Sequence, residues 1–128
     1  HDQVPLLVPE INPYHAALIK KQNFDPEGNG WIVTNPNCVS VPLSMSLRPL
    51  HDAFGIDSLV VTSMQSVSGA GYPGVSSMDI VANVVPYIGG EEPKVQTEAT
   101  KVLGNISGNS ISFNDFTIQA TAVRVPTI

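Results

Sequence analysis

The sequence is short of cysteine, of charge and of long apolar runs, and each shortage excludes a class of protein. One cysteine, Cys38, allows neither a disulfide within the chain nor a multi-cysteine metal site, and the three histidines show no ligand spacing. Without about 18 consecutive apolar residues or a basic-then-apolar leader, we expect a cytosolic protein that crosses no membrane. A net charge of −5, with no cluster of Lys and Arg, argues against nucleic-acid or anionic membrane partners.

The composition is that of a folded chain, since 42% of the 128 residues are hydrophobic and 13% are charged. In the first half, apolar runs predict strands over Val4–Val8 and Trp31–Thr34, and Asn12-Pro13 predicts a helix start between them. This order resembles the end of a βαβ unit. A second helix is expected after Cys38, with an apolar face formed by Val41, Leu43, Leu47, Leu50 and Phe54.

The second half predicts two more strands and a third helix. Strands are expected over Ser58–Met64 and, from its alternating pattern, over Phe116–Ile128, with a long loop over Ser66–Ser77. The helix should begin at Glu91 and end at Leu103-Gly104, with glycine as its C-cap. We therefore expect an α/β chain whose later part is α+β with a mixed sheet. Because neither end tapers into polar residues, we expect a piece of a longer chain.

Cys38 is the most informative residue. It follows a predicted strand and the turn Asn35-Pro36-Asn37, and it precedes a predicted helix, so backbone N–H groups should lie beneath the sulfur and favour the thiolate. A buried, inert cysteine is the alternative, because unpaired cysteines are often packing groups. Gln65, at the end of another predicted strand, could meet Cys38 at the same sheet edge.

Five segments carry a recognisable pattern along most of the chain. They are VPEINP at 8–13, NPNC at 35–38, QSVSGAG at 65–71, PYIGGEE at 86–92 and RVP at 124–126. In this order and spacing they resemble the aspartate-semialdehyde dehydrogenase family, of the archaeal and fungal type. The resemblance implies an oligomeric, NADP-dependent oxidoreductase that converts β-aspartyl phosphate to aspartate semialdehyde, on the route to lysine, threonine, methionine and isoleucine. It also implies that residues 1–37 end an NADP-binding domain and that residues 38–128 are part of a catalytic and dimerisation domain.

The same resemblance assigns a role to each matching residue. It makes Cys38 the nucleophile that forms the acyl thioester, and Gln65 the residue that holds the substrate near the sulfur. The substrate-binding set is Asn37, Glu91, Lys94 and Arg124, with Arg124 as the clamp for the α-carboxylate. Ser68 and Gly69 match the loop that approaches the nicotinamide.

Each of these residues also has a purely structural alternative. Gln65 could cap a strand end, Glu91 and Lys94 could be solvated charges at a helix start, and Arg124 could be the outward residue of an alternating strand.

The chain departs from the family pattern in three ways. It contains no G-x-G-x-x-G fingerprint for a dinucleotide. The family's general acid/base histidine, seven residues after the arginine, would fall beyond Ile128, so the chain alone is expected to be inactive. Val39 stands where the family more often has a small hydroxyl residue. The functional alternatives are a malonyl-CoA reductase on the same scaffold and a non-catalytic dimerisation module that uses the loop and the apolar segment 80–85.

Overall fold

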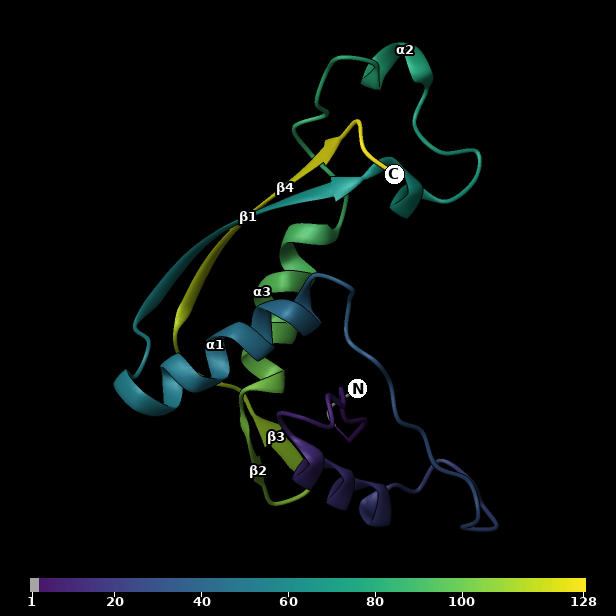
Figure 1. The fold of residues 1–128 in the computed structure, drawn as a ribbon. Coiled ribbons are helices and arrows are strands. Elements are labelled where there is room, and N and C mark those ends of the chain that lie inside the picture. The colour runs from purple at the N-terminus through teal and green to yellow at the C-terminus, as the bar shows by residue number, and fades with distance from the viewer. Residues whose placement is uncertain (1–2) are drawn as a thin grey trace.

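Two long parallel strands, β1 and β4, and two helices, α1 and α3, form the centre of the molecule (Figure 1). The computed structural model describes residues 3–128. The elements in chain order are η1 (Pro13–Lys21), α1 (Ser40–Phe54), β1 (Ser58–Ser66), η2 (Val67–Ala70), α2 (Ser77–Ile80), α3 (Glu91–Val102), β2 (Asn105–Ser107), β3 (Ser110–Ser112) and β4 (Thr117–Val125). Within residues 3–128, none of the helices has the length and apolar character needed to cross a bilayer.

The β1–β4 pair has one covered face and one open face. Its register pairs Ser58 with Thr117 and Gln65 with Arg124, so paired side chains lie on the same face. Burial alternates along both strands, as the period of two requires. Helix α3 packs on the covered face, and α1 packs against α3. The buried core is formed by Val8, Ile11, Leu47, Val95, Ala99, Val102, Leu103, Phe116, Ile118 and Ala120.

The four central elements confirm the helix predicted after Cys38 and the two strands and the helix predicted in the second half, with corrections at their ends. The last strand does not run to Ile128; it ends at Val125, because Pro126 has no N–H to continue the ladder. An antiparallel bridge between Val85 and Arg124 makes the pairing mixed, as expected. On α1, the predicted apolar face is only partly covered, since Phe54 is 85% exposed.

The two strands predicted before Cys38 are wrong. Leu6 and Thr34 do run parallel, but they form a single isolated bridge, and the segment between them is the 3-10 helix η1. Two local features prevent a ladder. Pro5 has no N–H to donate, and the Gln22 side chain takes both backbone groups of Ile32, donating to its carbonyl at 2.7 Å and accepting its N–H at 2.8 Å.

Helix α3 ends at the predicted place, but its C-cap is Leu103 and not the predicted glycine. Helix α3 ends through Leu103 in a right-handed conformation, and Gly104 is required for space, because a Cβ there would lie 2.3 Å from the Ser112 carbonyl oxygen. That close approach comes from the β2–β3 hairpin, which we did not predict. Its Gly108-Asn109 turn, with Gly108 at a φ of 60°, is the signal that could have identified it.

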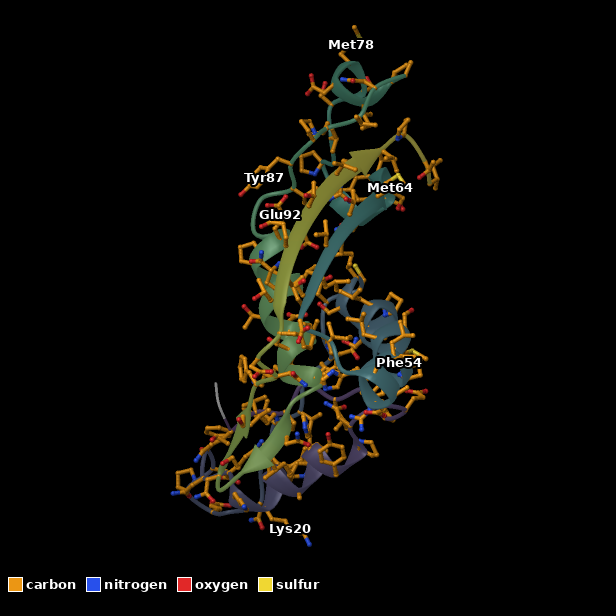
Figure 2. The ribbon with its side chains drawn as sticks, turned by 90° about the vertical axis from the view of Figure 1, so that its left-hand side faces the viewer. Lys20, Phe54, Met64, Met78, Tyr87 and Glu92 are labelled. Atoms are coloured by element: carbon orange, nitrogen blue, oxygen red, sulfur yellow. The ribbon has the colours of Figure 1, made fainter. Side chains whose placement is uncertain are left out.

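The loop predicted over 66–77 belongs to a longer arm, residues 66–90, that extends away from the core. It contains two short helices, η2 and α2, and Figure 2 shows Met78 of α2 at the opposite end of the molecule from Lys20. The arm returns to the sheet where Val85 exchanges two backbone hydrogen bonds with Arg124, at 2.8 and 3.0 Å.

Candidate active site

Cys38 lies two residues before the first residue of α1, with its side chain exposed. The Asn37 side-chain oxygen accepts the Val39 N–H at 2.8 Å, and the Asn37 carbonyl accepts the Val41 N–H at 3.2 Å. These two contacts form a turn that contains Cys38 and leads into α1. The helix predicted after the thiol is confirmed, whereas the strand predicted before it is not formed. The alternative of a buried packing cysteine is wrong, because Cys38 is exposed.

Glu91, the first residue of α3, joins the predicted site residues. One of its carboxylate oxygens accepts the Asn37 side-chain amide at 2.9 Å and the Gln65 side-chain amide at 3.3 Å. The other oxygen forms an ion pair with Lys94 at 3.3 Å. The structure thus brings together the residue before the cysteine, the end of β1 and the first turn of α3. Their assigned roles in substrate binding stay predictions.

The surroundings of Glu91 favour its ionised form. Burial by itself raises the pKa of Glu91, but the hydrogen bonds from Asn37 and Gln65, together with Lys94, outweigh it, so this pKa lies below the ordinary value of 4.5. The Glu91 side chain is 13% exposed and the Lys94 side chain is 55% exposed. A largely buried carboxylate beside an exposed ammonium group can bind a substrate that carries both an amino group and an anionic end.

Arg124 belongs to the covered face of the sheet, next to Gln65 in the register. It is 6% exposed, and its Nη1 donates to the Ser66 carbonyl at 2.8 Å. The alternative of an outward-facing Arg124 is therefore wrong. A guanidinium that is held from one side keeps its remaining N–H groups in a defined direction, which suits recognition of a carboxylate.

Ser68 and Gly69 lie on η2, and both are exposed. A Cβ at Gly69 would lie 3.1 Å from Arg124 Nη1, so this glycine gives the guanidinium room. Nothing in this geometry tests the predicted contact with nicotinamide. The residues that the structure describes do not fit a complete dinucleotide site. The glycine-rich segment after β1 forms the four-residue η2 itself, and it does not open a helix that could receive a pyrophosphate.

One residue of this cluster escaped the sequence analysis. Glu98, two turns after Glu91 on the same face of α3, accepts the Asn37 backbone N–H at 2.6 Å. The signal was present, because two glutamates at this spacing share a helix face. Their partner could not be inferred, since the donor is a backbone group from a distant turn.

Comparison with known proteins decides the family. A family described as "Semialdehyde dehydrogenase, dimerisation domain" matches residues 47–128. The chain belongs to the semialdehyde dehydrogenase family. The aspartate-semialdehyde dehydrogenase of Archaeoglobus fulgidus is 49% identical over 127 residues, which are 99% of this chain and 37% of that enzyme. The crystal structure of the Candida albicans aspartate-semialdehyde dehydrogenase with NADP superposes with a TM-score of 0.83 and 35% identity, over 100% of this chain and 38% of that one.

A second activity occurs among the relatives of this semialdehyde dehydrogenase chain. The malonyl-CoA reductase (NADP) of Metallosphaera sedula is 38% identical over 127 residues, which are 98% of this chain and 36% of that enzyme. The chain spans a little over a third of the length of the relatives that it matches. The family resemblance of the five segments is confirmed, including its archaeal and fungal character.

Proposed function

We propose that this chain carries the nucleophile and the substrate contacts of an aspartate-semialdehyde dehydrogenase that uses NADP. The observation that supports this most directly is the exposed Cys38 at a helix start, beside an Asn37 that Glu91 links to Gln65 and Lys94. Such a cluster offers a nucleophile, amide donors and both signs of charge within one small region.

In the proposed reaction, the Cys38 thiolate attacks the carbonyl carbon of β-aspartyl phosphate. The carbon–oxygen bond to phosphate breaks, phosphate leaves with the bonding electrons, and an acyl thioester remains on the sulfur. The nicotinamide cofactor, when bound, supplies the hydride that reduces this thioester, and cleavage of the carbon–sulfur bond releases the aldehyde and restores the thiolate. Gln65 holds the acyl group, Glu91 binds the substrate's amino group, Lys94 faces the phosphate, and Arg124 binds the α-carboxylate.

Substitution of Cys38 tests the proposal in the full-length protein. Wild-type protein should form NADPH from aspartate semialdehyde, phosphate and NADP, and Cys38→Ala should lower kcat by at least about 1,000-fold, as expected when a covalent nucleophile is removed. Unchanged turnover in Cys38→Ala would refute the mechanism. Gly89→Ala is a matched control, because a Cβ at Gly89 meets no heavy atom within 4 Å, and it should keep wild-type activity.

Malonyl-CoA reduction is the second candidate, supported by the Metallosphaera relative. The two substrates differ in the α-amino group, which malonyl-CoA lacks. If Glu91 binds that group, Glu91→Gln should impair turnover of aspartate semialdehyde strongly and turnover of malonyl-CoA weakly. A wild-type protein that reduces malonyl-CoA and does not act on aspartate semialdehyde would select the second candidate.

We also propose that the protein assembles as a homo-oligomer through the open face of the β1–β4 sheet. The matched family region is described as a dimerisation domain and includes both strands. On this face Val60 is 80% exposed and Met64 is 75% exposed, although β-branched and apolar residues on a sheet usually pack against something. A second copy of the chain is the partner that the family description favours.

A further inference from the structure

Asn37, the residue before the candidate nucleophile, is held by α3 at two points. Its side-chain amide donates to Glu91 at 2.9 Å, and its backbone N–H donates to Glu98 Oε2 at 2.6 Å. The first contact fixes a side chain, whereas the second fixes the peptide plane between Pro36 and Asn37. Two such contacts together restrain both the position and the orientation of the turn that presents Cys38.

The second contact is a strong one for its type. A backbone N–H that donates to a carboxylate forms a charge-assisted bond, which is shorter and stronger than a bond to a neutral acceptor. Glu98 stands on a well-anchored part of α3, because Val95 is 2% exposed and Ala99 is not exposed at all. The restraint on Asn37 is thus transmitted from the core and does not depend on a flexible surface group.

We propose that Glu98 is a positioning residue for Cys38, acting through the Asn37 backbone. Its kinetic consequence rests on the proposed function, in which Cys38 is the nucleophile. Glu98 has no substrate role there, because binding is assigned to the side chains of Asn37, Glu91, Lys94 and Arg124, and the Asn37 side chain keeps its own contact with Glu91. Loss of the Glu98 contact should therefore lower kcat and leave KM within about twofold, since a displacement of about 1 Å at a reacting group can cost about 100-fold in rate.

Three substitutions of Glu98 in the full-length protein separate the effect of its side-chain length from the effect of its charge. Glu98→Gln keeps an oxygen acceptor at the same distance along the side chain, whereas Glu98→Asp keeps the charge and withdraws it by one methylene. We expect kcat to fall by about 10- to 100-fold in Glu98→Ala and Glu98→Asp, and to recover in Glu98→Gln. A role of Glu98 through its charge alone would give the opposite order, with Asp above Gln, and would overturn the proposal.

Hydrogen exchange supplies a measurement that does not depend on dehydrogenase activity. The amide of Asn37 should exchange roughly tenfold faster in Glu98→Asp than in Glu98→Gln, because the side-chain oxygen in Glu98→Gln still accepts this N–H, whereas the shorter carboxylate in Glu98→Asp does not reach it. Equal exchange in these two variants would overturn the proposal, even if the wild-type protein turned over neither aspartate semialdehyde nor malonyl-CoA. If Glu98→Ala does not fold, the comparison of Glu98→Asp with Glu98→Gln still tests the positioning role of Glu98.

Glu92→Ala is the matched control for stability. Glu92 Oε1 also accepts a backbone N–H from another element, that of Ala122 at 3.1 Å, but this contact joins α3 to β4. Glu92→Ala should lower the stability of the protein as Glu98→Asp does, and leave the exchange of the Asn37 amide as in the wild type. A similar increase in Asn37 exchange in Glu92→Ala would show general loosening and would overturn a specific role for Glu98.

Discussion

At the scale of the residue, His15 shows how tightly this fold specifies one protonation state. Its ring is fully buried, Nδ1 lies 2.9 Å from the Asn12 amide nitrogen, and Nε2 lies 3.0 Å from the Gly104 carbonyl oxygen. The Asn12 orientation is set by two backbone contacts, since its oxygen accepts the Val8 N–H and its nitrogen donates to Leu6. Nδ1 must therefore accept and Nε2 must donate, which only the neutral imidazole can do.

This arrangement predicts that stability falls at mildly acidic pH. Burial is the largest effect and lowers the pKa of His15 below 6.5; the Gly104 hydrogen bond opposes it, and the charges of Lys101 and Arg48 lower it further. The unfolded chain thus binds a proton at a higher pH than the folded one. The contribution of neutral His15 is complete above pH 6.5 and falls as the pH drops from 6.5 toward its pKa in the fold. The free energy of unfolding, measured by urea denaturation between pH 5 and 8, should depend less steeply on pH in His15→Gln than in the wild type.

Tyr14→Phe is the matched control for this prediction. The Tyr14 hydroxyl donates to the same Gly104 carbonyl oxygen at 3.0 Å. Loss of this hydrogen bond should lower the free energy of unfolding by about 1 kcal/mol at every pH and leave its dependence on pH unchanged. If the free energy of unfolding of His15→Gln depended on pH as it does in the wild type, His15 would not be the cause of that dependence.

The candidate site could be predicted from the sequence to the extent that it depends on side-chain chemistry. Asn37, Gln65, Glu91 and Lys94 do come together, as the resemblance implied. The contribution of Glu98 could not be predicted, because its partner is a backbone N–H whose position exists only after the turn at Asn37 has folded.

At the scale of the element, long segments with clear periodicity were predictable and short ones were not. The helices α1 and α3 and the strands β1 and β4 follow from patterns that extend over nine residues or more. The helix start predicted at Asn12-Pro13 is confirmed by η1, but the two strands predicted on either side of it are not formed, since Gln22 occupies the backbone groups of Ile32 that a ladder would need. No pattern of hydrophobicity records such a side-chain contact.

The junction between α3 and the β2–β3 hairpin gives a prediction at this scale. A Cβ at Gly104 would lie 2.3 Å from the Ser112 carbonyl oxygen and 3.1 Å from Ile111 Cγ2, so the hairpin must move away from α3 to admit it. Gly104→Ala should lower the free energy of unfolding by about 1–3 kcal/mol, the usual cost of overpacking, as measured by urea denaturation. Gly89→Ala, which adds a Cβ in open space, should change it by less than about 0.5 kcal/mol. Equal losses in the two variants would contradict the close approach.

At the scale of the whole molecule, two of the surfaces that expose apolar residues are candidates for the interface between copies of the chain. One is the open face of the β1–β4 sheet, with Val60 and Met64, and the other is the arm, with Met78 at its tip (Figure 2). Met78 is 87% exposed, so exposure alone does not choose between them. Shape does favour the sheet, because a twisted two-stranded surface can pack against an identical surface of a second copy, whereas a tip offers little area.

Charge substitutions distinguish these two surfaces. In a twofold interface each substitution occurs twice, and burying an apolar side chain contributes about 1.5–3 kcal/mol, so Val60→Lys with Met64→Lys should raise the dissociation constant of the assembly by at least about 100-fold. Sedimentation velocity over a dilution series of the full-length protein measures this constant. Phe54→Lys, at the end of α1 and 85% exposed, places the same charge outside both surfaces and should leave the assembly intact. If Met78→Lys dissociated the assembly and Val60→Lys with Met64→Lys did not, the interface would lie on the arm and not on the sheet. The reason is that a buried lysine weakens only the contact that desolvates it.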